Sequence, residues 1–197
     1  MTVKSKTLEE SIEISKENQK LLIWHIIGGL VIILLGTIFH FIFEWSNYWK
    51  PVGWFVAVNE SVWEHFKLGF WPGIMFYLVE FFFLRKKTNN YWIAKGIALY
   101  LNPIIIAMLF YTYRGALGIE SLIIDILTFM IAVIIQQYVS YKIVKAEKIS
   151  EKFDFLLNIG AIIAILILTT MFVVFTYYPP QIPLFYDMEV GGYGILN

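Results

Sequence analysis

The sequence predicts an all-α integral membrane protein, a polytopic bundle of five transmembrane helices with its N-terminus inside and its C-terminus outside. Three observations predict this class. Hydrophobic residues make up 59% of the 197 positions and charged residues only 15%, unlike a water-soluble globular domain. The apolar residues form five runs of about 20, the length of a helix that crosses the hydrocarbon core. Positive charges gather in alternate connections between those runs.

The five apolar runs lie at residues 21–43, 62 or 68–84, 91–113, 119–141 and 153–178. They leave no length for a separate soluble domain, so we expect one five-helix membrane domain over residues 21–178. Eleven lysines and arginines precede the first run or join the second to the third and the fourth to the fifth: Lys4, Lys6, Lys16, Lys20, Arg85, Lys86, Lys87, Lys142, Lys145, Lys148 and Lys152. Positively charged short loops stay in the cytoplasm, which indicates an N-inside protein of the cell membrane.

Three segments lie outside these runs. Residues 1–20 are expected to form a cytosolic amphipathic helix, because Thr7 and Glu10 have the spacing of a capping box. Residues 51–60 are too short to cross and are expected to be interfacial or re-entrant. Residues 179–197 are rich in proline and glycine, so we expect an extracytoplasmic tail that covers the outer face rather than a sixth helix.

Composition also excludes several function classes. The chain has no cysteine, so disulfides, thiolate nucleophiles and thiolate metal sites are excluded. Its formal net charge is zero and its lysines lie at helix ends, so it is not expected to bind nucleic acid. The expected partners are the lipid bilayer and a lipid or small-molecule substrate.

Polar residues from separate parts of the chain are predicted to lie at one depth near the outer surface. They are His40, Glu44, Glu60, Glu64, His65, Lys67, Arg114, Asp125 and Asp187. An ionisable group costs roughly 2.5 to 3.5 kcal/mol to insert and usually faces a cavity or a partner. We therefore predict an outward-facing cavity of histidines and carboxylates, with Arg114 and Lys67 as counter-charges and the tail around Asp187 as its cover.

The richest stretch, residues 59–67 (NESVWEHFK), also has a purely structural interpretation. Ser61 and Glu64 have the spacing of a capping box that would start the second membrane helix near Val62. Glu64 and Lys67 have the spacing of a favourable i,i+3 pair. This interpretation explains Ser61 and Glu64, and it explains Glu60, His65, His40 and Asp125 less well.

The functional interpretation is a metal-dependent membrane hydrolase acting on a lipid or amphiphile at the outer leaflet. We expect His40, Glu64 and His65 to bind a divalent metal such as zinc, which suits nitrogen and oxygen ligands. The metal would activate water, with Glu60, Glu64 and Asp125 as catalytic groups and Asp125 also as an additional ligand or a partner of the ligands. The residues expected to bind substrate are Asn59, Lys67, Arg114 and Asp187.

Two other functions fit the same residues. One is a proton- or cation-coupled transporter of small solutes, working as a homodimer because five spans make a small conduit. The other is a non-enzymatic membrane partner or sensor. A polar path from the cavity past Asn102 toward Glu80 would favour transport, and a sealed pocket would favour the enzyme.

The NESVWEHFK motif with the upstream His40, and the tail pattern P-P-x-x-P-L-F-Y-D at residues 179–187, resemble a family of small, uncharacterised multi-pass membrane proteins of bacteria and archaea, a domain of unknown function with an N-E-S-x-W-E-H motif. The resemblance covers nearly the whole chain and implies a membrane location without a reaction. A looser similarity links the chain to intramembrane metal hydrolases of the alkaline ceramidase type, although it lacks their group of histidines.

Overall fold

The structure, a computed structural model, describes residues 2–85 and 87–196, with side chains from residue 12 onward. It is an all-α fold, as predicted. Its long helices are α1 (Thr2–Trp45), α2 (Val62–Leu84), α3 (Tyr91–Leu117), α4 (Leu122–Lys145) and α5 (Asp154–Tyr177). All five are long and apolar enough to cross a membrane. Lys86, one of the charges behind the predicted orientation, lies outside the described residues.

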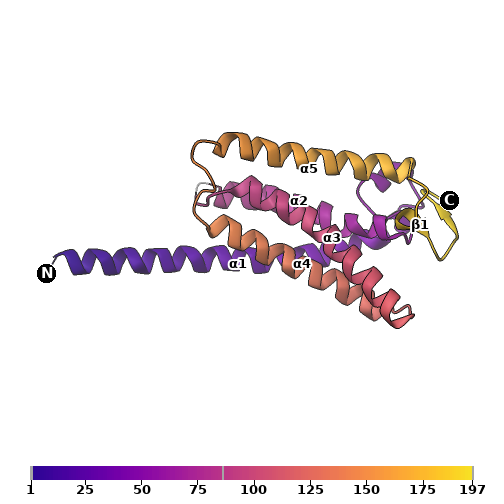
Figure 1. Cartoon of the computed structure of the whole chain (residues 1–197), viewed down its shortest axis with the longest axis horizontal. Helices are drawn as coiled ribbons and strands as arrows, with labels where there is room; N and C mark the ends of the chain where they lie inside the picture. The colour runs from indigo at the N-terminus through magenta and orange to yellow at the C-terminus, as the bar shows by residue number, and fades with distance from the viewer. Residues whose placement is uncertain (1, 86, 197) are drawn as a thin grey trace.

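Four of the helices form a closed ring. α2 packs against α1 and α3, and α4 packs against α3 and α1, so these helices surround a common interior. α5 lies outside the ring and packs chiefly on α3, on the opposite side from α1 (Figure 1). The N-terminal part of α1 extends past one end of the ring, and the tail folds over the other end (Figure 1).

The first helix is longer than predicted. Residues 2–45 form one continuous α-helix, so the expected helix at residues 1–20 and the first span are a single element. The predicted capping box is wrong, because the helix begins at Thr2 and Thr7 therefore lies within it. The charged residues that follow Thr7 keep the helical spacing, and nothing in the sequence interrupts the helix before the apolar run.

One of the two hydrogen bonds of the predicted capping box forms at the start of α2. Ser61 is the N-cap residue, and its hydroxyl accepts a hydrogen bond from the backbone N–H of Glu64 at 3.4 Å. The reciprocal bond is absent from the described contacts, because the Glu64 carboxylate accepts from the N–H of Val58 at 3.0 Å. The N–H of Ser61 donates instead to the side chain of Asn59 at 2.9 Å.

The connection from α1 to α2 folds against the bundle. It contains a short 3-10 helix, η1 (Lys50–Trp54), followed by the buried residues Val56, Ala57 and Val58. Val56 and Val58 pack in one cluster with Phe43 of α1. Protein therefore covers much of this irregular backbone, which is the condition for irregular structure at membrane depth.

The tail forms a small hairpin rather than a sixth helix. It contains a 3-10 turn, η2 (Pro183–Phe185), and two short antiparallel strands, β1 (Tyr186–Asp187) and β2 (Gly192–Tyr193). Phe185 is buried against Trp63, with 4.7 Å between the ring centroids, and against Phe175 of α5. This aromatic contact fixes the hairpin on the end of the bundle.

Candidate metal centre and pocket

Two histidines and a carboxylate converge at the tail end of the bundle. His40 lies near the end of α1, His65 in the first turns of α2, and Glu60 in the loop just before α2. Each of the three offers one ligand atom within 4.8 Å of the others. We call this group the triad (His40, Glu60, His65).

The spacing within the triad is close to that of metal ligands. Nε2 of His65 lies 3.4 Å from Oε2 of Glu60, and Nε2 of His40 lies 3.9 Å from Oε1 of Glu60. Two ligand atoms about 2.0 to 2.1 Å from a tetrahedral zinc ion are roughly 3.3 Å apart. The two histidine–glutamate pairs therefore lie near the spacing that a shared divalent ion requires.

The hydrogen bonding of His65 directs one ring nitrogen toward Glu60. Nδ1 of His65 lies 2.8 Å from the Ser61 carbonyl oxygen, which can only accept, so Nδ1 carries a hydrogen. Nε2 then faces the Glu60 carboxylate. A neutral Nε2 would direct its lone pair at that carboxylate, so the arrangement requires a proton or a cation between the two groups.

Contacts to both its backbone N–H and its carboxylate hold Glu60 in place. Its N–H donates to Oδ2 of Asp187 at 3.0 Å, and Asp187 is itself only 1% exposed. The neighbouring Asn59 donates from its side chain to the carbonyl of Gly194 at 2.8 Å, which ties the loop to the tail a second time. Hydrogen bonding from His65 holds the pKa of the Glu60 carboxyl below its usual value, so Glu60 is a carboxylate at neutral pH.

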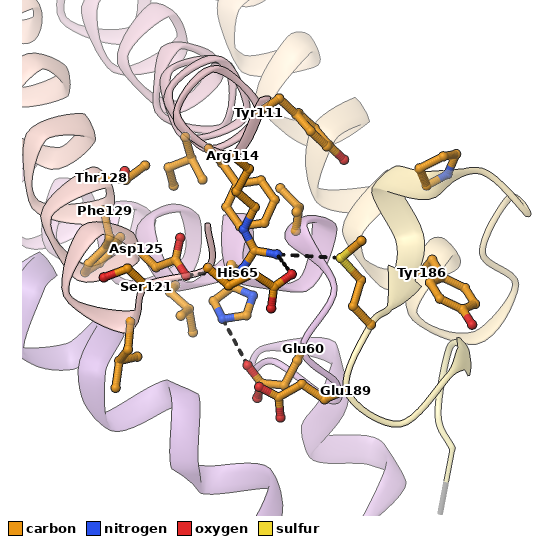
Figure 2. A pocket seen from close by; sticks show the side chains of 18 of the residues that line it. Glu60, His65, Tyr111, Arg114, Ser121, Asp125, Thr128, Phe129, Tyr186 and Glu189 are labelled. Atoms are coloured by element: carbon orange, nitrogen blue, oxygen red, sulfur yellow. Dashed lines mark hydrogen bonds and ion pairs between the residues drawn. The ribbon is translucent and has the colours of Figure 1, made fainter. Parts of the chain in front are cut away.

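The triad opens onto a cavity of about 490 Å³ between α1, α2, α3, α4 and the tail. In Figure 2, Glu60 and His65 point toward each other, and Arg114 and Asp125 lie on the same cavity. Apolar side chains form much of the remaining wall: Val62, Leu68, Ile106, Phe110, Leu122 and Phe129. Pro183, Tyr186, Met188 and Glu189 bring the tail to this cavity. The pocket therefore combines a polar group with an apolar lining.

The opposite wall carries a charged pair. Arg114 of α3 lies 3.4 Å from Oδ2 of Asp125 on α4 and donates to Glu120 at 2.8 Å. Oδ1 of Asp125 accepts from the hydroxyl of Tyr113 at 2.5 Å. Arg114 also lies over the ring of Phe110. These contacts hold the guanidinium at the pocket wall while one of its partners, Glu120, is largely exposed.

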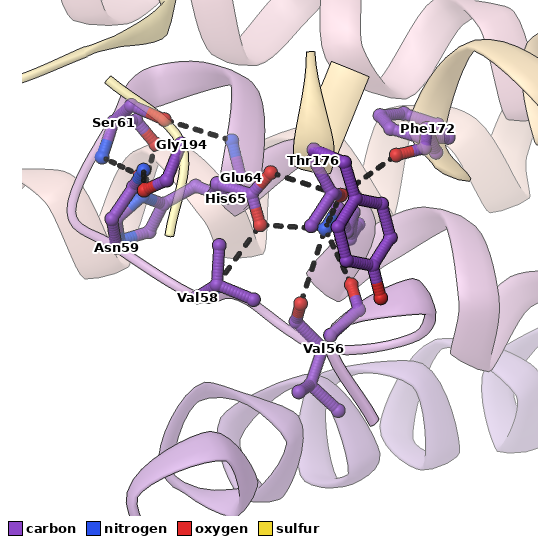
Figure 3. Close-up of polar contacts among 12 residues, drawn as sticks. Val56, Val58, Asn59, Ser61, Glu64, His65, Phe172, Thr176 and Gly194 are labelled. Carbon is purple, nitrogen blue, oxygen red and sulfur yellow. Dashed lines mark hydrogen bonds and ion pairs between the residues drawn. The ribbon is translucent and has the colours of Figure 1, made fainter. Parts of the chain in front are cut away.

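Glu64 and Lys67 form a different cluster, buried behind the loop. The Lys67 ammonium contacts Glu64 at 2.6 Å, the Thr176 hydroxyl at 2.5 Å, and the carbonyls of Gly53 and Val56 at 2.8 and 3.2 Å. We call these residues the Lys67 cluster (Gly53, Val56, Glu64, Lys67, Thr176); Figure 3 shows its contacts. It joins η1 and the following loop to α2 and α5.

Comparison with known proteins places the chain in one family. Residues 13–195 match a family of unknown function, DUF6512. The chain belongs to this family. The match extends from α1 to the tail, so it includes the triad, the pocket and the Lys67 cluster. No curated protein and no solved structure matches the chain significantly.

The structure brings together five of the residues predicted to form the site. His40, Glu60, His65, Arg114 and Asp125 all line the pocket. Four others lie elsewhere: Glu44 is exposed on α1, Glu64 and Lys67 bond to each other, and Asp187 caps the loop and its own turn. Asn59 contacts the loop and the tail. The carboxylate beside the two histidines is Glu60, where the sequence had suggested Glu64.

Sequence reasoning missed a second polar cluster inside the ring. His25 and Glu80 belong to this cluster. Both are buried, and Glu80 lies 2.6 Å from Lys95. Lys95, the lone lysine inside the third apolar run, could have indicated this cluster from the sequence. A buried lysine in a membrane span requires an acceptor on a neighbouring helix.

Proposed function

We propose that this protein is a metal-dependent membrane enzyme that hydrolyses a lipid or another amphiphile in the pocket, with the pocket facing the outside of the cell membrane. The observation that carries the proposal is the triad at the wall of a cavity. Two histidines and one glutamate form the ligand set of several catalytic zinc sites, in which the fourth position holds water. His40, Glu60 and His65 supply the ligands, and a fourth position can face the pocket.

The other residues of the pocket have roles in such a reaction. A bound metal would activate water for attack on the substrate. Asp125 has a carboxylate in the pocket and can accept a proton from that water, and Arg114 can stabilise negative charge as it develops on the substrate. The apolar wall of Leu68, Phe110 and Phe129 suits the hydrocarbon part of an amphiphile.

Metal analysis of the purified protein tests this proposal. We expect about one equivalent of a divalent metal after purification in metal-replete buffer, and its loss in both His40→Ala and His65→Ala. The third histidine, His25, provides the matched control, because His25→Gln removes an imidazole far from the triad. Metal-free wild-type protein, or unchanged metal in both triad variants, would overturn the proposal.

Activity is measured on phospholipids with a fluorescent acyl chain in mixed micelles. We expect product release by the metal-loaded protein and none after chelation, with restoration when metal is added back. Solute or ion movement into liposomes without any cleavage would instead favour the transporter. If neither cleavage nor movement is detected, the remaining interpretation is a membrane partner or sensor.

Asp187 is predicted to position Glu60 without contacting the metal. In Asp187→Ala the Glu60 N–H loses its acceptor, and the turn at Glu189 and Val190 loses two hydrogen bonds to Oδ1. Partners of metal ligands typically contribute 10- to 100-fold to affinity, so we expect zinc to bind about 10- to 100-fold more weakly. Competition with a chelating dye measures this change.

The control for this variant is Glu44→Ala. Glu44 lies on α1 one turn beyond His40, and it is exposed. We expect its removal to leave zinc affinity unchanged. Equal affinities for Asp187→Ala and Glu44→Ala would show that the tail does not position the triad.

A further inference from the structure

A second group of ionisable side chains lies inside the ring, on the side away from the pocket. We call it the Glu80 cluster (His25, Glu80, Lys95, Ser140); each residue comes from a different helix of the ring and is at most 3% exposed. The Lys95 ammonium lies 2.6 Å from Glu80, 2.9 Å from the Ser140 hydroxyl and 3.4 Å from Nε2 of His25. Neither DUF6512 membership nor the proposed hydrolysis accounts for this cluster.

The cation in this cluster has more hydrogen-bonding partners than the carboxylate has. Nδ1 of His25 donates to the Leu21 carbonyl at 2.8 Å, so its Nε2 is able to accept from Lys95. Lys95 therefore has three acceptors. Among the described residues, the Glu80 carboxylate has one stabilising partner, the Lys95 ammonium at 2.6 Å, and neither of its oxygens accepts from a second donor. Glu64 in the Lys67 cluster differs, because it accepts from the N–H of Val58 as well as from Lys67.

This difference matters for proton binding. A buried carboxylate with a single donor is less well stabilised as an anion than one with several, and taking up a proton relieves part of that cost. The other titratable groups around Glu80 are His25 on α1, Tyr77 on α2, and Tyr91 and Lys95 on α3. Among these groups only Lys95 brings an ammonium against the Glu80 carboxylate, so one attractive contact holds the Glu80 charge.

The cluster is close to one end of the bundle. Glu80 lies four residues before the end of α2 at Leu84, and Lys95 four residues after the start of α3 at Tyr91. Four residues of helix span roughly 6 Å. An apolar layer that includes Leu21, Leu84 and Tyr91 covers the cluster at this end. A proton from water has therefore only a thin layer to cross.

Buried polar groups continue from the cluster toward the pocket. Gln136 donates to the hydroxyl of Tyr77 at 3.0 Å, and Tyr91 donates to the Tyr77 carbonyl at 2.6 Å. One turn beyond Leu99 on α3, Asn102 is fully buried, and its amide oxygen and nitrogen have no partner in the described part of the chain. These groups extend along the ring interior between its two ends.

Glycines and prolines lie beside these buried amides: the glycines make room for the amides, and the prolines leave backbone carbonyls without a helical hydrogen bond. The amide of Asn102 lies against Gly69 of α2, where a side chain would overlap it, and the amide of Gln136 lies close to Gly73, where an added Cβ would be 3.2 Å from its nitrogen. Pro72 and Pro103 lack an N–H, so each leaves the carbonyl four residues earlier without its helical donor. These carbonyls belong to Leu68, which lines the pocket, and to Leu99, which packs against Gly73.

Three helices of the ring, α1, α2 and α4, each carry two polar residues at the same separation. His25 and His40 on α1, Glu80 and His65 on α2, and Ser140 and Asp125 on α4 are each separated by about four turns, or roughly 22 Å. The first member of each pair is in the Glu80 cluster, and the second lines the pocket. The interior thus has a polar layer at each end, with Tyr77, Gln136 and Asn102 between them. A polar path past Asn102 toward Glu80 is the arrangement expected of a transporter, so the inference drawn from it is independent of the proposed hydrolysis.

We propose that the Glu80 cluster is a proton-exchange site within the membrane span, and that Tyr77, Gln136 and Asn102 continue it as a proton route toward the pocket. The Glu80 carboxylate takes a proton from water at the near end and becomes a carboxylic acid, while Lys95 keeps its own proton and its bonds to Ser140 and His25. The same proton then leaves Glu80 through water that enters beside the unpartnered amides. Only O–H bonds form and break.

Infrared difference spectra of the full chain in liposomes test the exchange site. We expect a carboxylic C=O band that appears as the pH is lowered, disappears in Glu80→Gln and persists in the exposed control Glu44→Gln. If Glu80→Gln does not fold, Glu80→Asp must shift the band. A band that is unchanged in both Glu80 variants overturns the proposal.

Proton flux tests the route. Liposomes that contain a pH-sensitive dye are expected to equilibrate a pH gradient faster with the wild-type protein than without protein, and Asn102→Leu should abolish this excess. The leucine replaces an unpartnered amide by an apolar group of similar size, so the variant should fold. Equal flux in the wild type and Asn102→Leu overturns the route. Metal content should be unchanged in Glu80→Gln and Asn102→Leu, so either failure leaves the triad proposal standing.

Discussion

Replacing Lys67 by methionine is expected to destabilise the folded protein by about 3 to 5 kcal/mol, the cost of breaking a buried ion pair on one side. The side chains of Lys67 and Glu64 are 0% and 2% exposed. The variant leaves the Glu64 carboxylate buried without its cation, and the carbonyls of Gly53 and Val56 lose their donor. Denaturant or thermal unfolding in detergent micelles measures the effect.

The matched control is an exposed pair in the same chain. Lys87 lies 3.6 Å from Glu17, and both side chains are 50% exposed. An exposed ion pair contributes about 0 to 1 kcal/mol, so Lys87→Met should change stability by no more than that. The double variant Glu64→Leu with Lys67→Met should recover part of the lost stability, because no unpaired charge remains. A similar small effect of Lys67→Met and Lys87→Met would contradict the assigned role of the Lys67 cluster.

Gly36→Ala is expected to destabilise the protein by about 1 to 3 kcal/mol and to weaken metal binding. A Cβ at Gly36 would lie 2.5 Å from the carbonyl oxygen of Leu68 and 2.7 Å from Cζ of Phe129. The first of these atoms belongs to the α2 backbone, so relief requires α1 and α2 to separate. His40 lies one turn beyond Gly36, and this separation would move it away from His65.

A glycine on the outer helix provides the comparison. Gly160 lies in α5, and no atom of the described residues outside its own helix lies within 4 Å of an added Cβ. Gly160→Ala should stabilise the helix by up to about 1 kcal/mol through its better helix propensity. Unfolding midpoints and zinc affinities of the two variants test the prediction. If both leave zinc affinity unchanged, the close approach of α1 and α2 does not position His40.

The sequence was sufficient to predict the five helices because the physical constraint is strong. A chain in hydrocarbon must satisfy every backbone hydrogen bond internally, so a long apolar run can only be a helix. Helix ends were harder to predict. The first helix begins at Thr2 because nothing separates the polar and apolar halves of α1, and α3 continues to Leu117, where Gly118 ends it in the left-handed region.

The sequence suggested that His40 and His65 lie together, but it did not identify the carboxylate beside them. Glu64 and His65 are adjacent in a helix, so their side chains point in directions about 100° apart and do not meet on one face. Lys67, three residues after Glu64, shares its face and takes the carboxylate. Glu60 precedes the helix in an extended loop, and its side chain can turn back to His65. The start of α2 therefore decides which carboxylate joins the histidines.

Contacts between helices were the part that a single sequence could not provide. The spacing of Glu80 and Lys95 does not reveal that α2 and α3 place them 2.6 Å apart. Nor does it show that Asp187 accepts from a backbone N–H far earlier in the chain. Such pairs depend on the rotation of each helix about its axis, which the packing of all four ring helices sets together.

The tail hairpin affects the order in which the protein is built. Residues 183–189 contribute to the pocket wall and hold Glu60, yet the ribosome makes them after all five helices. A nascent chain that has already inserted its helices therefore still lacks a finished centre. The arrangement of the triad therefore depends on a hairpin that can fold into place only after the five helices have been made.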